Sequence, residues 1–450
     1  MTKFQRHVLM FYARKKQIVT TAVILAVVLF LGVATVVLCF TEQGQSIVDD
    51  VKDVWKDSIA SVQKKQNTDQ LKYTLNADGT GYIVSADGVW ENSHIEIPML
   101  HNDLPVTEVM DNGFFHCGAV SIEIPDSVTR IGNNAFANCT NLRQVTISKN
   151  VTEIGKGAFS GCTSLQSITI PNGVKYLDAH IFSDCTRLER VVLPKKMTAI
   201  CEYAFTNCVS LKDIELPDGL TTIRPYTFYG CAELKEITIP DGVKSIRAYA
   251  FAKSGITEIV IPEGGQRIEK YAFFQCKLKT VIVEYGVKDI EEYAFADCAA
   301  LQEVVLPDSV VEIKDWAFSD CVSLSEVRLS NHLEALNRNV FENCTSLTEV
   351  TIPGSVITIY QGAFSGCTSL TNVTLSDGVM HVCDTAFSNC TALKRITIPD
   401  SIYWMYFSFP ECPGLTDIYF TGTEEEWRGT FIAYQPLPDT VTVHFNYTGE

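Results

Sequence analysis

The sequence predicts an α/β solenoid in which one short unit is repeated along most of the chain. Three observations predict it. A phenylalanine recurs every 22 to 23 residues, the spacing Phe-x-x-Cys-x-x-Leu-x-x-Val-x-Ile follows it, and turn residues come after that apolar run. One such unit cannot bury its own apolar face, so neighbouring units must stack to form a continuous core.

Each repeat unit contains one phenylalanine at the same position. In one copy Phe136 is followed by Cys139, Leu142, Val145 and Ile147, and the same spacing returns in later copies. About fourteen units are marked in this way, by Phe114, Phe136, Phe159, Phe182, Phe205, Phe228, Phe251, Phe273, Phe295, Phe318, Phe341, Phe364, Phe387 and, in a degraded copy, Phe409.

Each part of the unit has a structural role. The end of the Leu-x-x-Val-x-Ile run alternates apolar and polar residues, as a half-buried strand must. Proline often follows, as at Pro125, where a missing N–H does no harm, and Asp-Gly, Asn-Gly or Asp-Ser makes the turn. Val128 and Ile131 then return to the core, and Phe136 and Cys139 have the spacing of a short helical turn. We expect one long parallel sheet with short helical or 3-10 turns on the other side.

The N-terminal region predicts a membrane anchor. Residues 18–40, from Ile18 to Phe40, form a run of 23 residues without a charged side chain. A helix of that length spans roughly 34 Å and can cross the lipid bilayer. Basic residues precede the run and acidic residues follow it, so the N-terminus is expected in the cytoplasm and the rest outside the cell. A cleaved signal peptide remains the alternative, although the run is long for one and no small-residue cleavage site follows.

The chain is therefore expected to have six parts. They are a basic cytoplasmic segment at 1–17, a transmembrane helix at 18–40, a polar helical stalk at 41–66, a β-hairpin cap at 67–105, the repeats at 106–420 and a C-terminal cap at 421–450. The hairpin is predicted from two short alternating runs joined by Asp78 and Gly79.

The repeats resemble the BspA-type leucine-rich repeats of bacterial and some protist surface proteins. The segment IPDSVTRIGNNAFANCTNLRQVTI and its copies carry the resemblance, which extends roughly from Leu71 to Tyr419. The ending DIYFTGTEEEWRGTF also resembles the segment that closes such arrays. The resemblance implies a right-handed solenoid, display at the cell surface and a role in adhesion to host, matrix or other cells. It implies no catalytic residues.

Thirteen of the sixteen cysteines occupy one position of the repeat. Equivalent positions of adjacent coils lie about 4.8 Å apart, so disulfides between neighbours are one possibility. A buried thiol also packs as a small apolar side chain, and Ser254 replaces the cysteine in one unit without other change. The second interpretation, a column of reduced thiols, is the one we favour.

Composition and motifs disfavour several classes of function. A formal net charge of −17 repels nucleic-acid phosphate. The histidines and cysteines show no metal-ligand spacing, and no phosphate-binding or nucleophile motif occurs. We therefore expect no enzyme activity, no metal and no cofactor.

Acidic residues mark a candidate partner-binding surface on the predicted sheet. They stand at, or next to, the outward position that precedes the first inward residue of the strand, so they should form a stripe: Asp213, Glu215, Glu236, Glu258, Glu303, Glu326 and Glu349. The stripe suits a basic protein surface or a divalent cation. A solvated face that keeps the sheet soluble is the alternative.

The favoured function is a membrane-anchored cell-surface protein that binds an extracellular protein or glycan through its extended sheet face. A structural or scaffolding role in the cell envelope is the alternative. A polysaccharide-degrading enzyme would need a convergent pair of carboxylates. Exposed aromatic residues on the strands would support sugar binding, but the outward positions are mostly charged or threonine, with Tyr419 the main exception.

Overall fold

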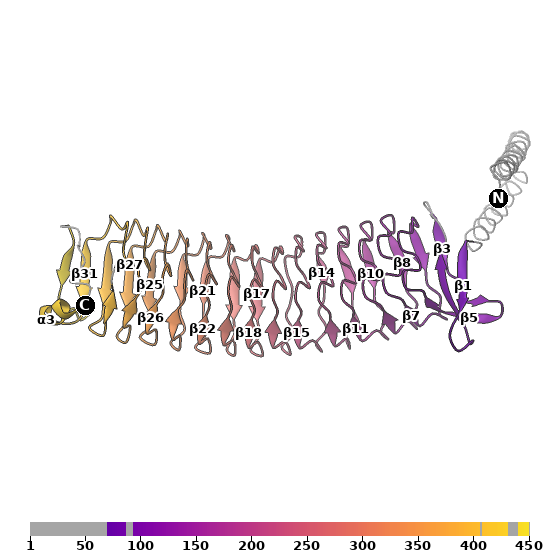
Figure 1. Cartoon of the computed structure of the whole chain (residues 1–450), viewed down its shortest axis with the longest axis horizontal. Coiled ribbons are helices and arrows are strands. Elements are labelled where there is room, and N and C mark those ends of the chain that lie inside the picture. The colour runs from indigo at the N-terminus through magenta and orange to yellow at the C-terminus, as the bar shows by residue number, and fades with distance from the viewer. Residues whose placement is uncertain (1–69, 87–92, 406, 431–439, 450) are drawn as a thin grey trace, which may run out of the picture. The chain divides into compact units, whose positions relative to one another are not determined.

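The computed structural model describes residues 70–86, 93–405, 407–430 and 440–449. The chain divides into two compact units, Met1–Asp69 and Gln70–Glu450, so every described residue belongs to the second. That unit is a long, narrow stack of coils (Figure 1). The predicted transmembrane helix and stalk lie outside the described residues. Within the described part of the chain, no helix has the length and apolar character needed to cross a membrane.

Most coils contribute a strand to a first face, and these strands run parallel. Successive strands pair with a register offset of one repeat, as where Glu258 lies opposite Thr280 and Thr280 opposite Glu303. The strands of the first face are β3 (His94–Glu96), β6 (Ser121–Glu123), β8 (Gln144–Thr146), β10 (Ser167–Thr169), β12 (Arg190–Val192), β14 (Asp213–Ile214), β17 (Glu258–Ile261), β19 (Thr280–Val283), β21 (Glu303–Val305), β23 (Glu326–Arg328), β25 (Glu349–Ile352), β27 (Asn372–Leu375), β29 (Arg395–Ile398), β31 (Asp417–Phe420) and β32 (Thr442–His444).

The coils also form a second parallel face, so the expectation of one long sheet was wrong. The apolar pair after the turn does more than return to the core, because its residues pair with those of the next coil, as Thr222 does with Ser245. The strands of this second face are β5 (Leu104–Val109), β7 (Arg130–Ile131), β9 (Glu153–Ile154), β11 (Tyr176–Leu177), β13 (Ala199–Ile200), β15 (Thr222–Ile223), β16 (Ser245–Ile246), β18 (Arg267–Ile268), β20 (Asp289–Ile290), β22 (Glu312–Ile313), β24 (Ala335–Leu336), β26 (Thr358–Ile359), β28 (His381–Val382) and β30 (Trp404–Met405).

The third side of the coil, which we call the turn face, is not helical as predicted. In a representative coil Asn134 and Asn138 both have left-handed backbone angles, with φ of 49° and 59°. A helix cannot continue through such residues, and two tight turns form instead. The backbone N–H groups of Asn134, Phe136 and Asn138 donate to carbonyls of the next coil, at 2.7 to 2.8 Å. The turn face is therefore held by hydrogen bonds between coils, as the two strand faces are.

The core runs along the inside of all three faces. The repeat phenylalanines from Phe114 to Phe387 are almost completely buried, and each ring stacks on the next, with centroids 5.3 Å apart for Phe114 and Phe136 and 5.1 Å for Phe295 and Phe318. The thirteen repeat cysteines are free and buried. All of these thiols except that of Cys117 donate to the phenylalanine carbonyl of the preceding coil, as from Cys162 to Phe136 at 3.2 Å. Most coils thus repeat the same buried contacts.

An antiparallel hairpin begins the described array. Its strands are β1 (Leu71–Leu75) and β2 (Tyr82–Ala86), and β2 pairs in parallel with β5. The short strand β4 (Leu100–His101) pairs antiparallel with β5. At the other end the helix α3 (Glu424–Gly429) begins with a capping box between Thr423 and Glu426 and buries Trp427. These elements cover the two ends of a stack whose middle is uniform.

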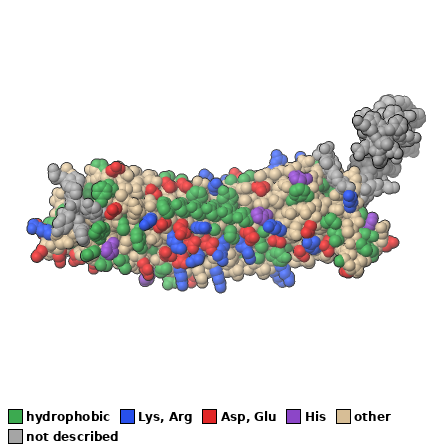
Figure 2. Space-filling view, in the orientation of Figure 1, with side chains coloured by type: hydrophobic (Ala, Val, Ile, Leu, Met, Phe, Trp, Pro, Cys, Tyr) green, Lys and Arg blue, Asp and Glu red, His purple; other side chains and the backbone are tan. Residues whose placement is uncertain are grey.

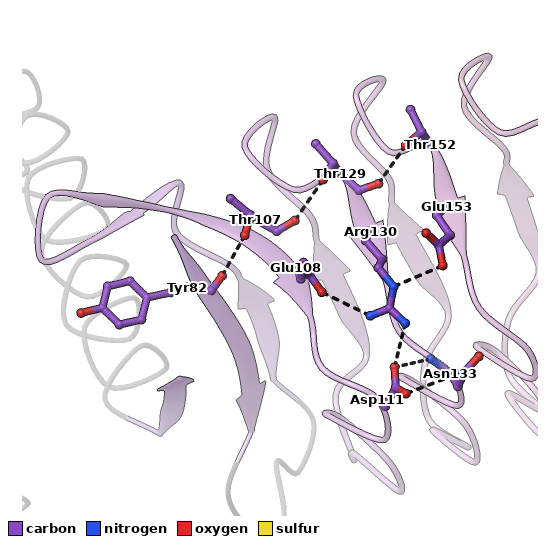
Figure 3. Close-up of polar contacts among 9 residues, drawn as sticks. All are labelled: Tyr82, Thr107, Glu108, Asp111, Thr129, Arg130, Asn133, Thr152 and Glu153. Atoms are coloured by element: carbon purple, nitrogen blue, oxygen red, sulfur yellow. Dashed lines mark hydrogen bonds and ion pairs between the residues drawn. The ribbon is translucent and has the colours of Figure 1, made fainter. Parts of the chain in front are cut away.

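An arginine joins the first coils on the second face. Arg130 contacts Glu108, Asp111 and Glu153, each at 3.2 Å, and so links β5, β7 and β9 (Figure 3). Burial alone would raise the pKa of Asp111, but hydrogen bonds from Asn133 and the charge of Arg130 hold that pKa below its usual value. The cluster is a local ionic tie near the N-terminal end of the array.

Candidate binding surfaces

The predicted acidic residues lie on the exposed side of the first face, but they do not form an unbroken stripe. Glu303 and Glu326 are direct neighbours on β21 and β23. Thr280 stands between Glu258 and Glu303, and Glu236 lies in a segment between β14 and β17 that is not a strand. Glu215 follows Asp213 by two residues, so it belongs to the next outward row. The structure thus brings some of the predicted carboxylates together and separates others.

Most of these carboxylates have no cationic partner. Asp213 forms an ion pair with Arg190 at 3.1 Å. Within the described part of the chain, no ion pair involves the other five carboxylates of this row, which are exposed: Glu236, Glu258, Glu303, Glu326 and Glu349. Carboxylates on adjacent strands repel one another, and the repulsion destabilises the sheet slightly. The surface therefore carries exposed negative charge that no ion pair with a described residue neutralises.

An exposed apolar row lies beside the carboxylates. Val260, Ile282 and Val305 occupy the next outward position of three adjacent strands and pair in register. Their exposed fractions are 44%, 53% and 42%. The sequence interpretation passed over them, because valine and isoleucine are common in strands on either face. Figure 2 shows hydrophobic side chains gathered over the middle of the array, beside a band of mixed acidic and basic side chains.

A polar depression opens where the hydrogen bonding of the first face is interrupted. The strands β23 and β25 belong to separate hydrogen-bonded groups. A depression of about 580 Å³ lies there, lined by Glu326, Arg328, Glu349 and Asn372 among others. It extends the acidic surface toward the C-terminal part of the array.

The second face differs from the first because several of its charges form ion pairs between coils. Arg247 contacts Glu269 at 2.6 Å, and Arg267 contacts Asp289 at 3.4 Å and Glu291 at 3.5 Å. These pairs join neighbouring coils, so they support the stack and neutralise its charges locally. The second face is a weaker candidate for binding a charged partner than the first.

The turn face carries a stack of half-buried aromatic side chains that the sequence interpretation missed. The ring sits two residues before the buried phenylalanine in seven consecutive coils, and we call these residues the surface aromatic stack: His180, Tyr203, Tyr226, Tyr249, Tyr271, Tyr293 and Trp316. Neighbouring ring centroids are 4.6 to 5.2 Å apart and the ring planes are within 10° of parallel. The recurring motif Tyr-Ala-Phe was the available signal in the sequence.

Every residue of this stack has a left-handed backbone, with φ between 56° and 59°. That conformation costs a residue with a side chain roughly 1–2 kcal/mol, while a stacked aromatic pair contributes about 0.5–1.5 kcal/mol. The cost of the backbone conformation and the gain from ring stacking roughly cancel. Four other coils use Asn134, Gly157, Asn339 or Gly362 at the same place, residues that adopt the conformation more readily, and the last coils use Thr385 and Phe407. The fold therefore does not require aromatic residues here.

The stack is uncharged at neutral pH. Burial raises the pKa of Tyr226, Tyr249 and Tyr293, so their hydroxyls keep their protons. Burial, helped by the charge of Lys156, lowers the pKa of His180, so its imidazole is neutral. The turn face thus offers neutral hydrogen-bonding groups, in contrast to the first face.

The described residues show no grouping of three or more His, Cys, Asp or Glu side chains suited to a metal ion. The buried thiols are also poor nucleophiles, because burial raises their pKa, to about 12 for Cys185, Cys276 and Cys367. The candidate sites described above are therefore extended surfaces.

The repeated coil, with its stacked phenylalanines, matches a known family. The family model described as "BspA type Leucine rich repeat region" matches over residues 107–235, 221–348 and 334–435, which together make up more than half of the chain. The chain belongs to the BspA-type leucine-rich-repeat family. The resemblance seen in the sequence is thereby confirmed.

Solved structures of other leucine-rich-repeat proteins are similar to this chain. A leucine-rich-repeat protein from Bacteroides ovatus is 26% identical, with a TM-score of 0.61, covering 84% of this chain and 98% of its own. A leucine-rich cell surface protein from Faecalibacterium prausnitzii is 29% identical, with a TM-score of 0.44, covering 80% of this chain and 95% of its own. No match to this chain was found among curated proteins. Members of the BspA-type family are surface proteins that generally bind other proteins.

Proposed function

We propose that this chain is a membrane-anchored cell-surface protein that binds an extracellular protein through its first face. One observation carries the proposal: the exposed row of Val260, Ile282 and Val305 lies beside carboxylates that form no ion pair with any described residue. Protein interfaces combine an apolar centre with a polar rim. The first face offers both elements on adjacent strands, whereas several charges of the second face are already held in ion pairs.

The charge of the first face indicates the chemistry of the partner. Lysine or arginine side chains on the partner would neutralise Glu258, Glu303 and Glu326 while its apolar side chains cover the valines and isoleucine. A second copy of this chain would instead bring carboxylates against carboxylates. A basic, partly apolar protein surface is therefore the favoured occupant. This pairing would also relieve the repulsion between Glu303 and Glu326.

The proposal of a membrane anchor is based on the sequence. The uncharged run at 18–40 is long enough to span a bilayer, and the basic residues before it favour a cytoplasmic N-terminus. An epitope tag at the C-terminus tests this arrangement in intact cells. The tag should be sensitive to added protease, and the chain should stay with membranes in alkaline carbonate. A protected tag, or release of the intact chain by carbonate, contradicts the anchored topology.

Binding is tested with the full-length chain purified in a mild detergent. We would immobilise it and measure the association of a panel of purified matrix and cell-surface proteins at low and moderate salt. The test variant combines Glu258→Gln, Glu303→Gln and Glu326→Gln, and a second variant is Ile282→Ser. The matched control combines Glu312→Gln, Glu334→Gln and Glu425→Gln, which changes the net charge equally at other places on the surface.

Saturable binding of a basic protein should weaken about tenfold or more in both test variants, and the control should bind as the unchanged chain does. Binding should also weaken with salt, because exposed charges are screened over about 10 Å at 0.1 M. Equal weakening in the control variant means that overall charge, and not the first face, attracts the partner. Absence of binding by a folded sample favours a scaffolding role in the envelope.

A further inference from the structure

The surface aromatic stack forms a straight, uncharged row on the side of the solenoid that the proposed protein interface does not use. Each inner ring of the stack is covered on both faces by its neighbours, at 4.6 to 5.2 Å. The rings are only half-buried, so the ring edges are what remains accessible. Five of these edges carry a tyrosine hydroxyl, which both donates and accepts hydrogen bonds.

The neighbouring row of the turn face extends this neutral surface. Three positions after a stacked ring, Thr206, Tyr229 and Phe274 are uncharged and partly exposed, whereas Ala252, Ala296 and Ser319 at the equivalent places are buried. Two of them add rings in other orientations. Tyr229 is tilted by 51° against Tyr226, and Phe274 stands at 86° to Tyr271, with centroids 5.6 and 5.4 Å apart. The surface therefore presents ring edges in one row and differently turned rings in the next.

The same chemical group recurs once per coil along this surface. A folded protein partner rarely repeats one contact at such regular steps, whereas a polymer of identical units does. One cation, Lys253, lies 5.6 Å from the ring centroid of Tyr229, but the net charge of −17 repels an anionic polymer. An uncharged polymer rich in hydroxyl and C–H groups matches the tyrosine hydroxyls and the aromatic rings.

We propose that the turn face between His180 and Trp316 binds a neutral polysaccharide chain laid along the solenoid axis, so that successive saccharide units contact the rings of successive coils. The tyrosine hydroxyls exchange hydrogen bonds with sugar hydroxyls, and Tyr229 and Phe274 contact sugar C–H groups. Asparagine or glycine adopts the left-handed backbone conformation at lower cost in other coils. The aromatic residues are therefore explained by ligand binding and not by the turn.

The chain itself supplies the variant that tests this site. Asn134 and Asn339 occupy the same place in other coils with φ of 49° and 54°. The triple variant Tyr226→Asn, Tyr249→Asn and Tyr271→Asn therefore keeps the backbone conformation while removing three central rings. Tyr176→Asn, an exposed tyrosine of the second face, is the matched control. Thermal melting of each variant shows that the coil stack remains intact.

Binding is measured by electrophoresis of the full-length chain, in mild detergent, through native gels that contain a soluble polysaccharide. The neutral probes are dextran, starch, xylan, a mannan and a mixed-linkage β-glucan, and hyaluronate is the anionic contrast. We expect at least one neutral probe to retard the chain, with an apparent affinity at least tenfold lower for the triple variant and unchanged for Tyr176→Asn. The same probe should change the tryptophan fluorescence of the unchanged chain. This change should be absent in the Trp316→Asn variant.

Three results overturn the proposal: no retardation by any neutral probe, retardation by hyaluronate alone, or equal retardation of the folded triple variant and the unchanged chain. The outcome is separable from the protein interface of the first face. The triple variant of Glu258, Glu303 and Glu326 should lose protein binding and retain polysaccharide binding, and the tyrosine variant should do the reverse.

Discussion

Two aromatic stacks run side by side through the same segments of this chain, and they obey different constraints. The buried stack of phenylalanines continues from Phe114 to Phe409. The surface aromatic stack occupies only the coils from His180 to Trp316, although the backbone around it is the same in the coils before and after. Burial is needed in every coil of a solenoid, since no coil can bury its own apolar face. An aromatic ring at the surface is not needed for core burial, so its recurrence in only some coils indicates a function in binding.

Alkaline pH should have the largest effect, and it should act on the buried cysteines of the core and not on the surface aromatic stack. Burial raises the pKa of Cys185, Cys276 and Cys367 from 9.0 to about 12, so these thiols stay protonated in the folded chain. Unfolded, they lose protons above about pH 9. Stability is thus complete below pH 9 and falls as pH rises toward 12, by up to about 1.4 kcal/mol per thiol and pH unit.

The measurement combines circular dichroism with alkylation of thiols followed by mass spectrometry. The half-exposed Cys201 and Cys383 should react before unfolding, and the thirteen buried thiols only with it. Reaction of the buried thiols in the folded chain at the rate of Cys201 would contradict a closed core.

Single substitutions in one coil should show the next largest difference. Phe273→Ala empties a fully buried site and should lower the free energy of unfolding by about 3–5 kcal/mol. Tyr271→Asn, two residues away, removes two stacking contacts but relieves the backbone conformation, so its effect should stay within about 1 kcal/mol. Chemical denaturation of both variants checks this, and equal losses would mean that the surface stack is structural.

The cysteine column should tolerate a hydroxyl at a modest cost. Cys298→Ser keeps a donor for the carbonyl of Phe273 but buries a more polar group, so we expect a loss of about 1 kcal/mol. Ser254 already occupies this position in another coil and contacts Cys276 at 3.3 Å. Cys201→Ser, outside the column, serves as the control and should have no measurable effect in the same denaturation experiment.

The smallest effect should come from the first face, and its sign should be favourable. Glu303→Gln removes repulsion from Glu326 on the adjacent strand and should raise the free energy of unfolding by about 0.5 kcal/mol at low salt. The gain should disappear at high salt, because the charges are exposed. A loss of stability would mean that Glu303 has a favourable partner within the chain, and the interpretation of an unneutralised surface would then be wrong.

The sequence determined the coil. The spacing from Phe136 through Cys139 and Leu142 to Ile147, repeated along the chain, was sufficient to predict a solenoid with a continuous core and a parallel first face, because only stacked units can bury such a pattern. It also placed the acidic residues on the outward side of that face. Alternation along a strand is a local property, so it can be read without knowing the neighbours.

Tertiary structure decided the rest. The pair at Arg130 and Ile131 is too short to indicate a strand by itself, and it becomes one only because the next coil supplies its hydrogen-bond partners. The spacing of Phe136 and Cys139 is compatible with a helical turn, but hydrogen bonding to the next coil favours the left-handed residues Asn134 and Asn138. The surface aromatic stack exists for the same reason: rings some 22 residues apart in sequence touch only because one coil lies directly on another.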